Sequence, residues 1–194
     1  MRIDIKDGWL YFDERFLAAE VSDQLFLSLL SSVPWEQGTI TLFGRKLAIP
    51  RREAFYAENG QTYGYSGQRL KTHAFTPLLS ELKTKIEQVS GTQFNSVLLN
   101  LYQNGTHSNG WHADDEKELG NAPVIASLSV GSTRRFDLKH KHTTDKLTFE
   151  LNSGSLLIMG GSLQHFWKHQ IPKQPRITEP RINLTFRKIV DPFR

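Results

Sequence analysis

The stretch PRINLTFRK, residues 180–188, decides the fold because polar and apolar side chains alternate along it. Arg181, Asn183, Thr185 and Arg187 fall on one face of the predicted strand, and Ile182, Leu184 and Phe186 on the other. If the apolar face packs against helices, the polar face lines a cavity, where a buried arginine requires an anion. The two arginines lie about 20 Å apart along a strand, so both could reach inward to one small dianion. The alternative is an edge strand with its polar face in water.

Upstream of this strand, the second half of the chain consists of short apolar or alternating runs separated by Gly, Asn and Ser. After residue 92 these runs are NSVLLNLY, PVIASLSVG, RRFDLKH, KLTFEL, GSLLIM and QHFWKHQI. Many short strands at this spacing predict a β-sandwich or jelly roll.

Two amphipathic helices precede the strands, which makes the fold class α+β. In residues 20–35, EVSDQLFLSLLSSVPW, Ser22 is the expected cap and Pro34 ends the helix. In residues 75–91, FTPLLSELKTKIEQVSG, Thr76 caps the helix, Pro77 occupies its first position and Gly91 terminates it. Both helices are expected to be scaffold.

Composition excludes several classes of protein. The chain of 194 residues is 38% hydrophobic, which suits one domain, and we expect a monomer. It contains no cysteine, so any metal must bind to His and carboxylate ligands. No apolar run is long enough to span a bilayer and no signal peptide is evident, so we expect an intracellular protein without a membrane partner, cytoplasmic in a bacterium or nuclear in a eukaryote. The net charge of +4 favours a polyanionic partner.

The segment GWHADDE places His112 and Asp114 two residues apart, on the same side of an extended chain. A His-x-Asp pair and one distant histidine form the ligand set of non-haem Fe(II) oxygenases, which leaves three metal positions open. The stretch LQHFWKHQ offers two candidates about 55 residues later, His165 and His169. Strand periodicity does not separate them, because positions i and i+4 share a face.

Taken in order, LFGRKLAIPR, TYGYSG, NLYQNG, WHADDE, GSLLIM, FWKHQIP and PRINLTFRKI resemble the AlkB-type Fe(II)/2-oxoglutarate dioxygenases, which repair alkylated nucleobases. The resemblance runs from about residue 40 to residue 189 and is closest to the animal branch that repairs duplex DNA. It implies a double-stranded β-helix core over residues 92–190, with the N-terminal helices packed on one sheet. It also implies a nucleotide-recognition lid over residues 36–75, within a single domain of residues 1–194.

The resemblance selects His169 as the second histidine ligand, because it follows an aromatic residue by two positions and precedes Arg181 by about a dozen. It therefore implies that His112, Asp114 and His169 are the catalytic metal ligands for Fe(II). For the co-substrate 2-oxoglutarate, it implies that the far carboxylate meets Arg181, Tyr102 and Asn183. Asn100 and Arg187 would serve the end near the iron.

Substrate recognition is expected to involve the lid and the acidic residues beside the metal. By resemblance, Tyr65 would stack on a flipped base, with Tyr63 and Ser66 nearby. Asp115 and Glu116 suit a cationic lesion, although a supporting or solvent-exposed role is the alternative.

Residues 40–49, ITLFGRKLAI, predict a hairpin with Gly44 in the turn and Phe43 at its tip, either as a wedge that fills the gap left by the flipped base or folded back on the protein. The basic residues Arg45, Lys46, Arg51 and Arg52, with TRR at 133–135, suit phosphate contacts.

The expected function is thus the oxidative demethylation of 1-methyladenine and 3-methylcytosine in DNA with Fe(II), 2-oxoglutarate and O2, releasing formaldehyde. The same chemistry on RNA or protein is an alternative. A second alternative is a non-catalytic jelly roll that binds nucleic acid, but the intact triad and both arginines argue against it.

Overall fold

The computed structural model describes residues 2–42, 45–58, 64–65, 68–69 and 71–190. The first half of the chain contains β1 (Arg2–Ile5), β2 (Gly8–Asp13), α1 (Ala19–Ser32), β3 (Thr39–Leu42), β4 (Arg45–Ala48), β5 (Arg52–Ala57), β6 (Gly64–Tyr65), β7 (Gln68–Arg69), β8 (Thr72–His73) and α2 (Pro77–Ser90). The second half contains β9 (Ser96–Tyr102), β10 (Asn109–His112), the 3₁₀ helix η2 (Lys117–Leu119), β11 (Ile125–Gly131), β12 (Arg134–His140), β13 (Lys146–Leu151), β14 (Leu156–Gly160), α3 (Leu163–Phe166), β15 (Trp167–Ile171) and β16 (Arg181–Arg187).

Strands β9 to β16, together with β1, β2, β5 and β8, form two facing sheets. The larger sheet has the order β1-β2-β14-β11-β16-β9-β5-β8, and the smaller has the order β10-β15-β12-β13. Following the chain from β9, the strands cross between the sheets, with only β12 and β13 joined as neighbours in one sheet. This alternation is that of a jelly roll, as the short strands predicted.

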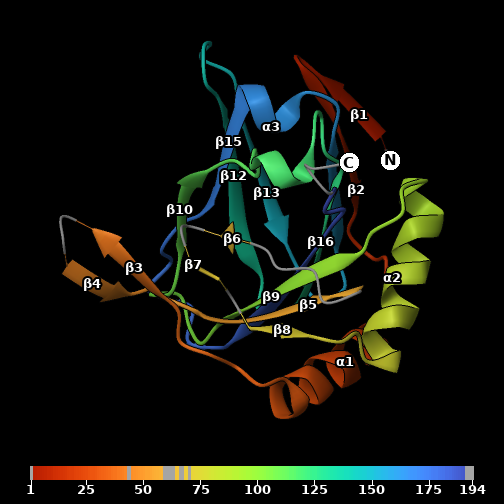
Figure 1. Cartoon of the computed structure of the whole chain (residues 1–194), viewed down its shortest axis with the longest axis vertical. Helices are drawn as coiled ribbons and strands as arrows, with labels where there is room; N and C mark the ends of the chain where they lie inside the picture. Colours follow the sequence, from red (N-terminus) through yellow and green to blue (C-terminus); the bar gives the residue numbers. More distant parts are fainter. Residues whose placement is uncertain (1, 43–44, 59–63, 66–67, 70, 191–194) are drawn as a thin grey trace.

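The helices α1 and α2 cover the outer face of the larger sheet (Figure 1). Leu25 and Leu29 of α1 and Ile86 of α2 join one apolar cluster with Ile182 and Leu184 of β16. A second cluster fills the space between the sheets, with Leu98, Leu157, Leu138 and Trp167 among its members. Strand β16 is buried along its whole length, between β11 and β9. The prediction that its apolar face packs on helices is therefore confirmed, and its polar face points between the sheets.

Helix α2 agrees with the prediction at both ends, whereas α1 begins earlier than expected. Thr76 accepts a hydrogen bond from the Leu79 amide, and Gly91 ends α2 in the left-handed conformation with φ of 65°. The expected Ser22 cap of α1 is wrong, because Ala18 occupies the cap position and Ser22 is buried inside the helix. Its hydroxyl donates back to the Ala19 carbonyl at 2.8 Å, as serine hydroxyls inside helices often do.

Two segments differ from the predicted strand pattern. The first residues form the hairpin β1–β2, which extends the larger sheet by pairing β2 with β14. The predicted strand QHFWKHQI begins only at Trp167, because residues 163–166 form the short helix α3.

The hairpin expected around LFG is present as β3 and β4, with Leu42 opposite Arg45, and its tip residues 43 and 44 lie outside the described part. In the described ranges, we find no helix of the length and apolar character that a membrane span requires.

Candidate metal centre

The floor of the central pocket is built by strands β9 and β16, whose inward side chains face one another in register. Arg181 lies opposite Tyr102, and Asn183 lies opposite Asn100. All of these residues line one pocket together with Arg187, and the smaller sheet closes it from the other side. The five residues expected to bind 2-oxoglutarate therefore share a single cavity.

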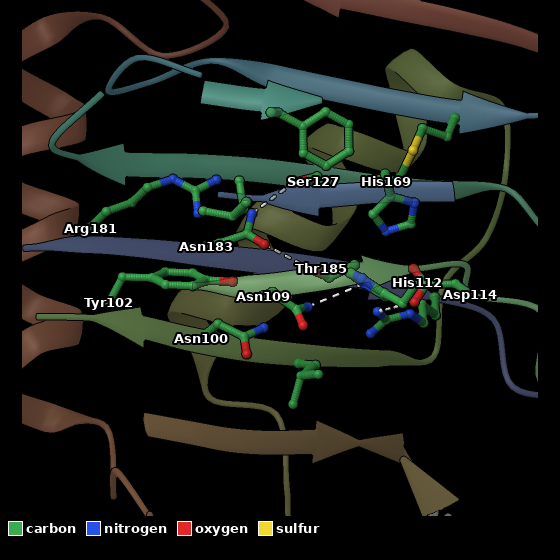
Figure 2. Close-up of a pocket in the computed structure, with 15 residues that line it drawn as sticks. Asn100, Tyr102, Asn109, His112, Asp114, Ser127, His169, Arg181, Asn183 and Thr185 are labelled. Atoms are coloured by element: carbon green, nitrogen blue, oxygen red, sulfur yellow. Dashed lines mark hydrogen bonds and ion pairs between the residues drawn. The ribbon is translucent and has the colours of Figure 1, made fainter. Parts of the chain in front are cut away.

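Strand pairing also assembles the expected metal ligands. His112, at the end of β10, lies directly opposite His169 on β15, and Asp114 follows two residues later. The ligand atoms of these three side chains lie within 4.8 Å of one another. Figure 2 shows this triad at one end of the pocket and Arg181 with Tyr102 at the other. His165 is exposed on α3 and does not belong to the triad.

The hydrogen bonds of His112 fix which nitrogen carries its proton. Its Nδ1 lies 2.7 Å from the Gly110 carbonyl oxygen. A carbonyl only accepts, so Nδ1 must donate, and the lone pair of the neutral ring is on Nε2. That lone pair faces Asn109 Nδ2 at 3.2 Å. An imidazole held in this way is oriented for metal ligation through Nε2.

Asp114 is held by two groups and is ionised. Arg187 Nη2 donates to its Oδ1 at 3.0 Å, and Gln164 Oε1 accepts from its backbone amide at 3.0 Å. Burial alone would raise the pKa of Asp114, but the positive charge of Arg187 and the hydrogen bond that it donates outweigh burial and lower this pKa to about 2.

The two histidines are neutral. Burial and then the neighbouring His112 lower the pKa of His169 to about 3, and burial also lowers the pKa of His112 against the attraction of Asp114. His169 is 4% exposed and stacks on Phe136. Its Nδ1 is buried without a hydrogen-bond partner, which is unfavourable unless a bound group satisfies it.

The opposite end of the pocket is cationic. Arg181 is 1% exposed, and its Nη2 donates to Ser129 Oγ at 2.8 Å. Its Nε and Nη1 are buried without a partner, and in the described part of the chain no acidic side chain pairs with it. Burial lowers its pKa to about 10, so it remains charged at neutral pH. A buried cation with two unsatisfied donors is suited to bind a carboxylate.

Asn183 and Asn100, two of the asparagines that line the pocket, differ in what they offer to a ligand. Asn183 Nδ2 donates to Ser127 Oγ at 2.7 Å and to the Leu128 carbonyl at 3.0 Å, so both amide hydrogens are engaged. Its oxygen accepts from Thr185 Oγ1 at 3.0 Å. Both N–H groups of Asn183 therefore bond within the protein, where they support the wall of the pocket. Asn100, in contrast, offers its amide nitrogen to the pocket.

These residues fit the ligands that the sequence implied. Two neutral imidazoles and one carboxylate form the facial set used by Fe(II), with positions left open. Arg181 lines the same pocket at its other end, where it can pair with a carboxylate. Arg187, expected near the iron end of the co-substrate, lines the same pocket and donates to the carboxylate of Asp114.

The residues expected to bind the substrate lie outside this pocket or outside the described residues. Asp115 accepts from Lys141 Nζ at 3.3 Å, and Glu116 immediately precedes η2; neither lines the pocket. Phe43, Tyr63 and Ser66 lie outside the described part of the chain, as does the side chain of Tyr65, whose backbone belongs to β6. The expectation that Arg51 and Arg134 contact phosphates is wrong, because their side chains are 5% and 0% exposed and donate hydrogen bonds within the protein.

Several residues of the site were not identified from the sequence. Ser127 and Ser129 lie on β11, opposite Thr185 and Asn183 of β16 respectively. The Ser127 hydroxyl accepts a hydrogen bond from Asn183, and the Ser129 hydroxyl accepts one from Arg181. The alternation in ASLSVG carried a signal for them, because every second residue is a small polar one. Gln164 carried no comparable signal, since its contact with Asp114 depends on the unexpected helix α3.

Comparison with known proteins places the chain in a family. A family model described as the 2OG-Fe(II) oxygenase superfamily matches residues 10–187. The protein named alpha-ketoglutarate-dependent dioxygenase alkB homolog 3 of Bos taurus is 39% identical over 183 residues, which cover 90% of this chain and 64% of that protein. The protein named DNA oxidative demethylase ALKBH2 is 36% identical in Mus musculus, over 87% of this chain and 75% of that protein. The protein of the same name in Arabidopsis thaliana is also 36% identical, over 97% of this chain and 69% of that protein.

The fold agrees with this assignment. A solved structure described as "The structure of OsALKBH1" superposes with a TM-score of 0.67 at 18% identity, covering 96% of this chain and 100% of that one. The chain spans 64% of the length of the alkB homolog 3 proteins from cattle and human. The resemblance carried by the seven motifs is confirmed, and the chain belongs to the 2OG-Fe(II) oxygenase superfamily and, within it, to the AlkB homologues.

Proposed function

We propose that this protein is an Fe(II)/2-oxoglutarate-dependent dioxygenase that removes methyl groups from alkylated bases in DNA, with 1-methyladenine and 3-methylcytosine as substrates. One observation supports this most directly. A His-Asp-His triad and a buried arginine with two unsatisfied donors occupy opposite ends of one pocket. The net charge of +4 and the relatives named as DNA oxidative demethylases favour nucleic acid as the substrate.

His112, Asp114 and His169 would hold the metal, and Arg181 with Tyr102 would bind the far carboxylate of 2-oxoglutarate. Together with oxygen, the bound iron and 2-oxoglutarate supply the oxidation that converts an N-methyl group into a hydroxymethyl group, which leaves as formaldehyde, while 2-oxoglutarate becomes succinate and carbon dioxide. Asn100 would donate to the co-substrate near the metal. Arg187 keeps Asp114 ionised, and Gln164 fixes its backbone.

Substrate binding belongs to the segment of residues 36–75 and to the acidic residues after the triad. In this proposal Tyr65 stacks on the flipped base, with Tyr63 and Ser66 beside it, and Phe43 fills the gap in the duplex. Asp115 and Glu116 favour a cationic methylated base over the neutral repaired one. Lys141, which pairs with Asp115, would have to release it when the base binds.

The test is a demethylation assay. Protein loaded with Fe(II) without oxygen would receive oxygen, 2-oxoglutarate and an oligonucleotide carrying 1-methyladenine, in single-stranded and duplex form, and loss of the methyl group would be followed by mass spectrometry. His169→Ala should abolish turnover, whereas the exposed His165→Ala should retain it. Succinate formation without demethylation would exclude these bases, and absence of iron binding would exclude the enzyme.

A further inference from the structure

Arg51 and Glu53 form a buried ion pair at the point where the β3–β4 hairpin enters the larger sheet. The two side chains are 5% and 3% exposed, and Arg51 Nη2 lies 2.8 Å from Glu53 Oε1. Gln37 stabilises the backbone at this junction, since its Nε2 donates hydrogen bonds to the carbonyl oxygens of Ile49 and Arg51. Buried pairs of this kind contribute little net stability, because the loss of hydration offsets the attraction. Their presence beside a pocket therefore suggests a positioning role.

The pair is connected to the pocket through Asn100. Glu53 and Asn100 are direct cross-strand partners on β5 and β9, and Arg51 Nε donates to Asn100 Oδ1 at 2.8 Å. A guanidinium only donates, so the oxygen of the amide must face Arg51. The Nδ2 group, with two hydrogens, is left for the pocket, and it donates to none of the residues that the structure describes. Figure 2 shows Asn100 below Tyr102, among the residues that line the pocket.

We propose that Arg51, balanced by Glu53, is a positioning residue that holds the Asn100 amide with its two N–H donors directed at the metal-proximal carboxylate of 2-oxoglutarate. This inference rests on the proposed function. Without Arg51, the amide can rotate and present its oxygen to the anion, which is repulsive. Arg51 pairs with Glu53 and does not line the pocket, so it acts through the orientation of Asn100 and not as a further anion ligand.

The same geometry separates this role from a contact with DNA. The guanidinium is committed to Glu53 and Asn100 and is almost fully buried, so it cannot reach a phosphate on the surface. Loss of Arg51 should therefore change the affinity for 2-oxoglutarate and leave the affinity for the oligonucleotide almost unchanged.

The experiment measures binding of 2-oxoglutarate by calorimetry to protein loaded with Mn(II) in place of Fe(II). Arg51→Met alone would leave Glu53 buried without a partner, so the main variant is Arg51→Met/Glu53→Met, which replaces the whole pair by apolar groups. Asn100→Ala and the triple variant complete a double-mutant cycle. Arg51→Lys keeps a donor. Lys83→Met is the matched control, because it removes the ion pair between Lys83 of α2 and Glu58 after β5, and neither residue lines the pocket of the triad.

The double variant should bind 2-oxoglutarate about tenfold more weakly than the wild type and bind Mn(II) as the wild type does. Adding Asn100→Ala to the double variant should cause no further loss of affinity for 2-oxoglutarate. Arg51→Lys should recover part of the affinity, and Lys83→Met should bind normally. If the double variant binds 2-oxoglutarate as tightly as the wild type, or if the losses of affinity add up in the triple variant, the inference about Arg51 is wrong and the proposed function is unaffected. A wild-type protein that binds Mn(II) but no 2-oxoglutarate would overturn the proposed function and the inference with it.

Discussion

Arg187 donates a hydrogen bond from Nη2 to Oδ1 of Asp114 at 3.0 Å, and the two side chains are 4% and 1% exposed. Arg187 is the last residue of β16, whereas Asp114 follows β10 in the other sheet. The final strand of the jelly roll therefore stabilises the negative charge of Asp114, a member of the His-Asp-His triad, from the opposite sheet. Without that arginine, burial would determine the ionisation of Asp114.

The first prediction concerns Arg187→Met. The depressed pKa of Asp114, about 2 against an ordinary 3.8, contributes stability above the unfolded pKa, and this contribution is lost as the pH falls through the folded one. In the variant, burial raises the pKa of Asp114 instead. The metal-free variant should then be less stable than wild type by about 3–5 kcal/mol at neutral pH, and the difference should shrink as the pH falls and Asp114 takes up a proton.

Urea unfolding of both proteins at a series of pH values measures this difference. Arg135→Met is the control, because its ion pair with Asp137 is partly exposed and should matter by less than about 1 kcal/mol. A deficit in Arg187→Met that stays constant from neutral to acid pH would show that Arg187 stabilises the fold without acting on Asp114.

The second prediction concerns the pH dependence of metal binding. Burial lowers the pKa of both histidines, to about 3 for His169, so neither ring has to lose a proton before it binds a metal at neutral pH. Between pH 8 and 5.5 the affinity for Mn(II) should fall by less than about tenfold. Two histidines with unshifted pKa values near 6.5 would lose about a hundredfold over this range. Titration at several pH values distinguishes the two cases.

Much of this site could be predicted from the sequence because its residues follow the strand period. Arg181 and Asn183 share a face by alternation, and His112 and Asp114 do so for the same reason. Local pattern could not choose between His165 and His169, because the answer depends on a tertiary fact. Residues 163–166 leave the strand as helix α3, and only His169 lies opposite His112.

The wrong expectations share a physical cause. Ser22 has the side chain of a helix cap, but the helix begins three residues earlier and its hydroxyl bonds within the first turns. Arg51 and Arg134 have the charge of a DNA contact, but both serve buried hydrogen bonds. Side-chain chemistry alone does not reveal whether a polar group meets solvent or bonds internally. Long-range strand pairing decides this.

The third prediction concerns Arg181→Met. Arg181 is a buried cation with unpartnered Nε and Nη1, and burial without a counter-charge is unfavourable in the ligand-free protein. The variant should bind 2-oxoglutarate at least about a hundredfold more weakly, since it loses a charge-assisted pair. Its melting temperature without ligand should equal or exceed that of the wild type.

Melting curves with and without 2-oxoglutarate, in the presence of Mn(II), test both statements. Addition of 2-oxoglutarate should raise the melting temperature of the wild type and leave that of the variant unchanged. If Arg181→Met melts far below the wild type without ligand, Arg181 serves the fold and is not held ready for an anion.

The fourth prediction concerns Gln164, which connects α3 to the metal centre. This side chain is fully buried, and its Oε1 accepts from the Asp114 amide at 3.0 Å. Gln164→Leu would leave that amide buried without an acceptor, which costs about 1–3 kcal/mol and frees the Asp114 backbone to move. We expect Mn(II) affinity to fall about tenfold. Gln164→Glu should keep more of the affinity, because a carboxyl oxygen can still accept the bond.

Gln170→Leu is the matched control for this substitution, because the Gln170 side chain, although next to His169 on β15, does not line the pocket and donates to Asp137. It should bind Mn(II) as the wild type does. The bond to the Asp114 amide can be observed directly by amide hydrogen exchange, which should accelerate at Asp114 in Gln164→Leu and not in Gln170→Leu. Normal metal affinity together with accelerated exchange would mean that the triad holds its geometry without this bond, and that Gln164 contributes only to the stability of the fold.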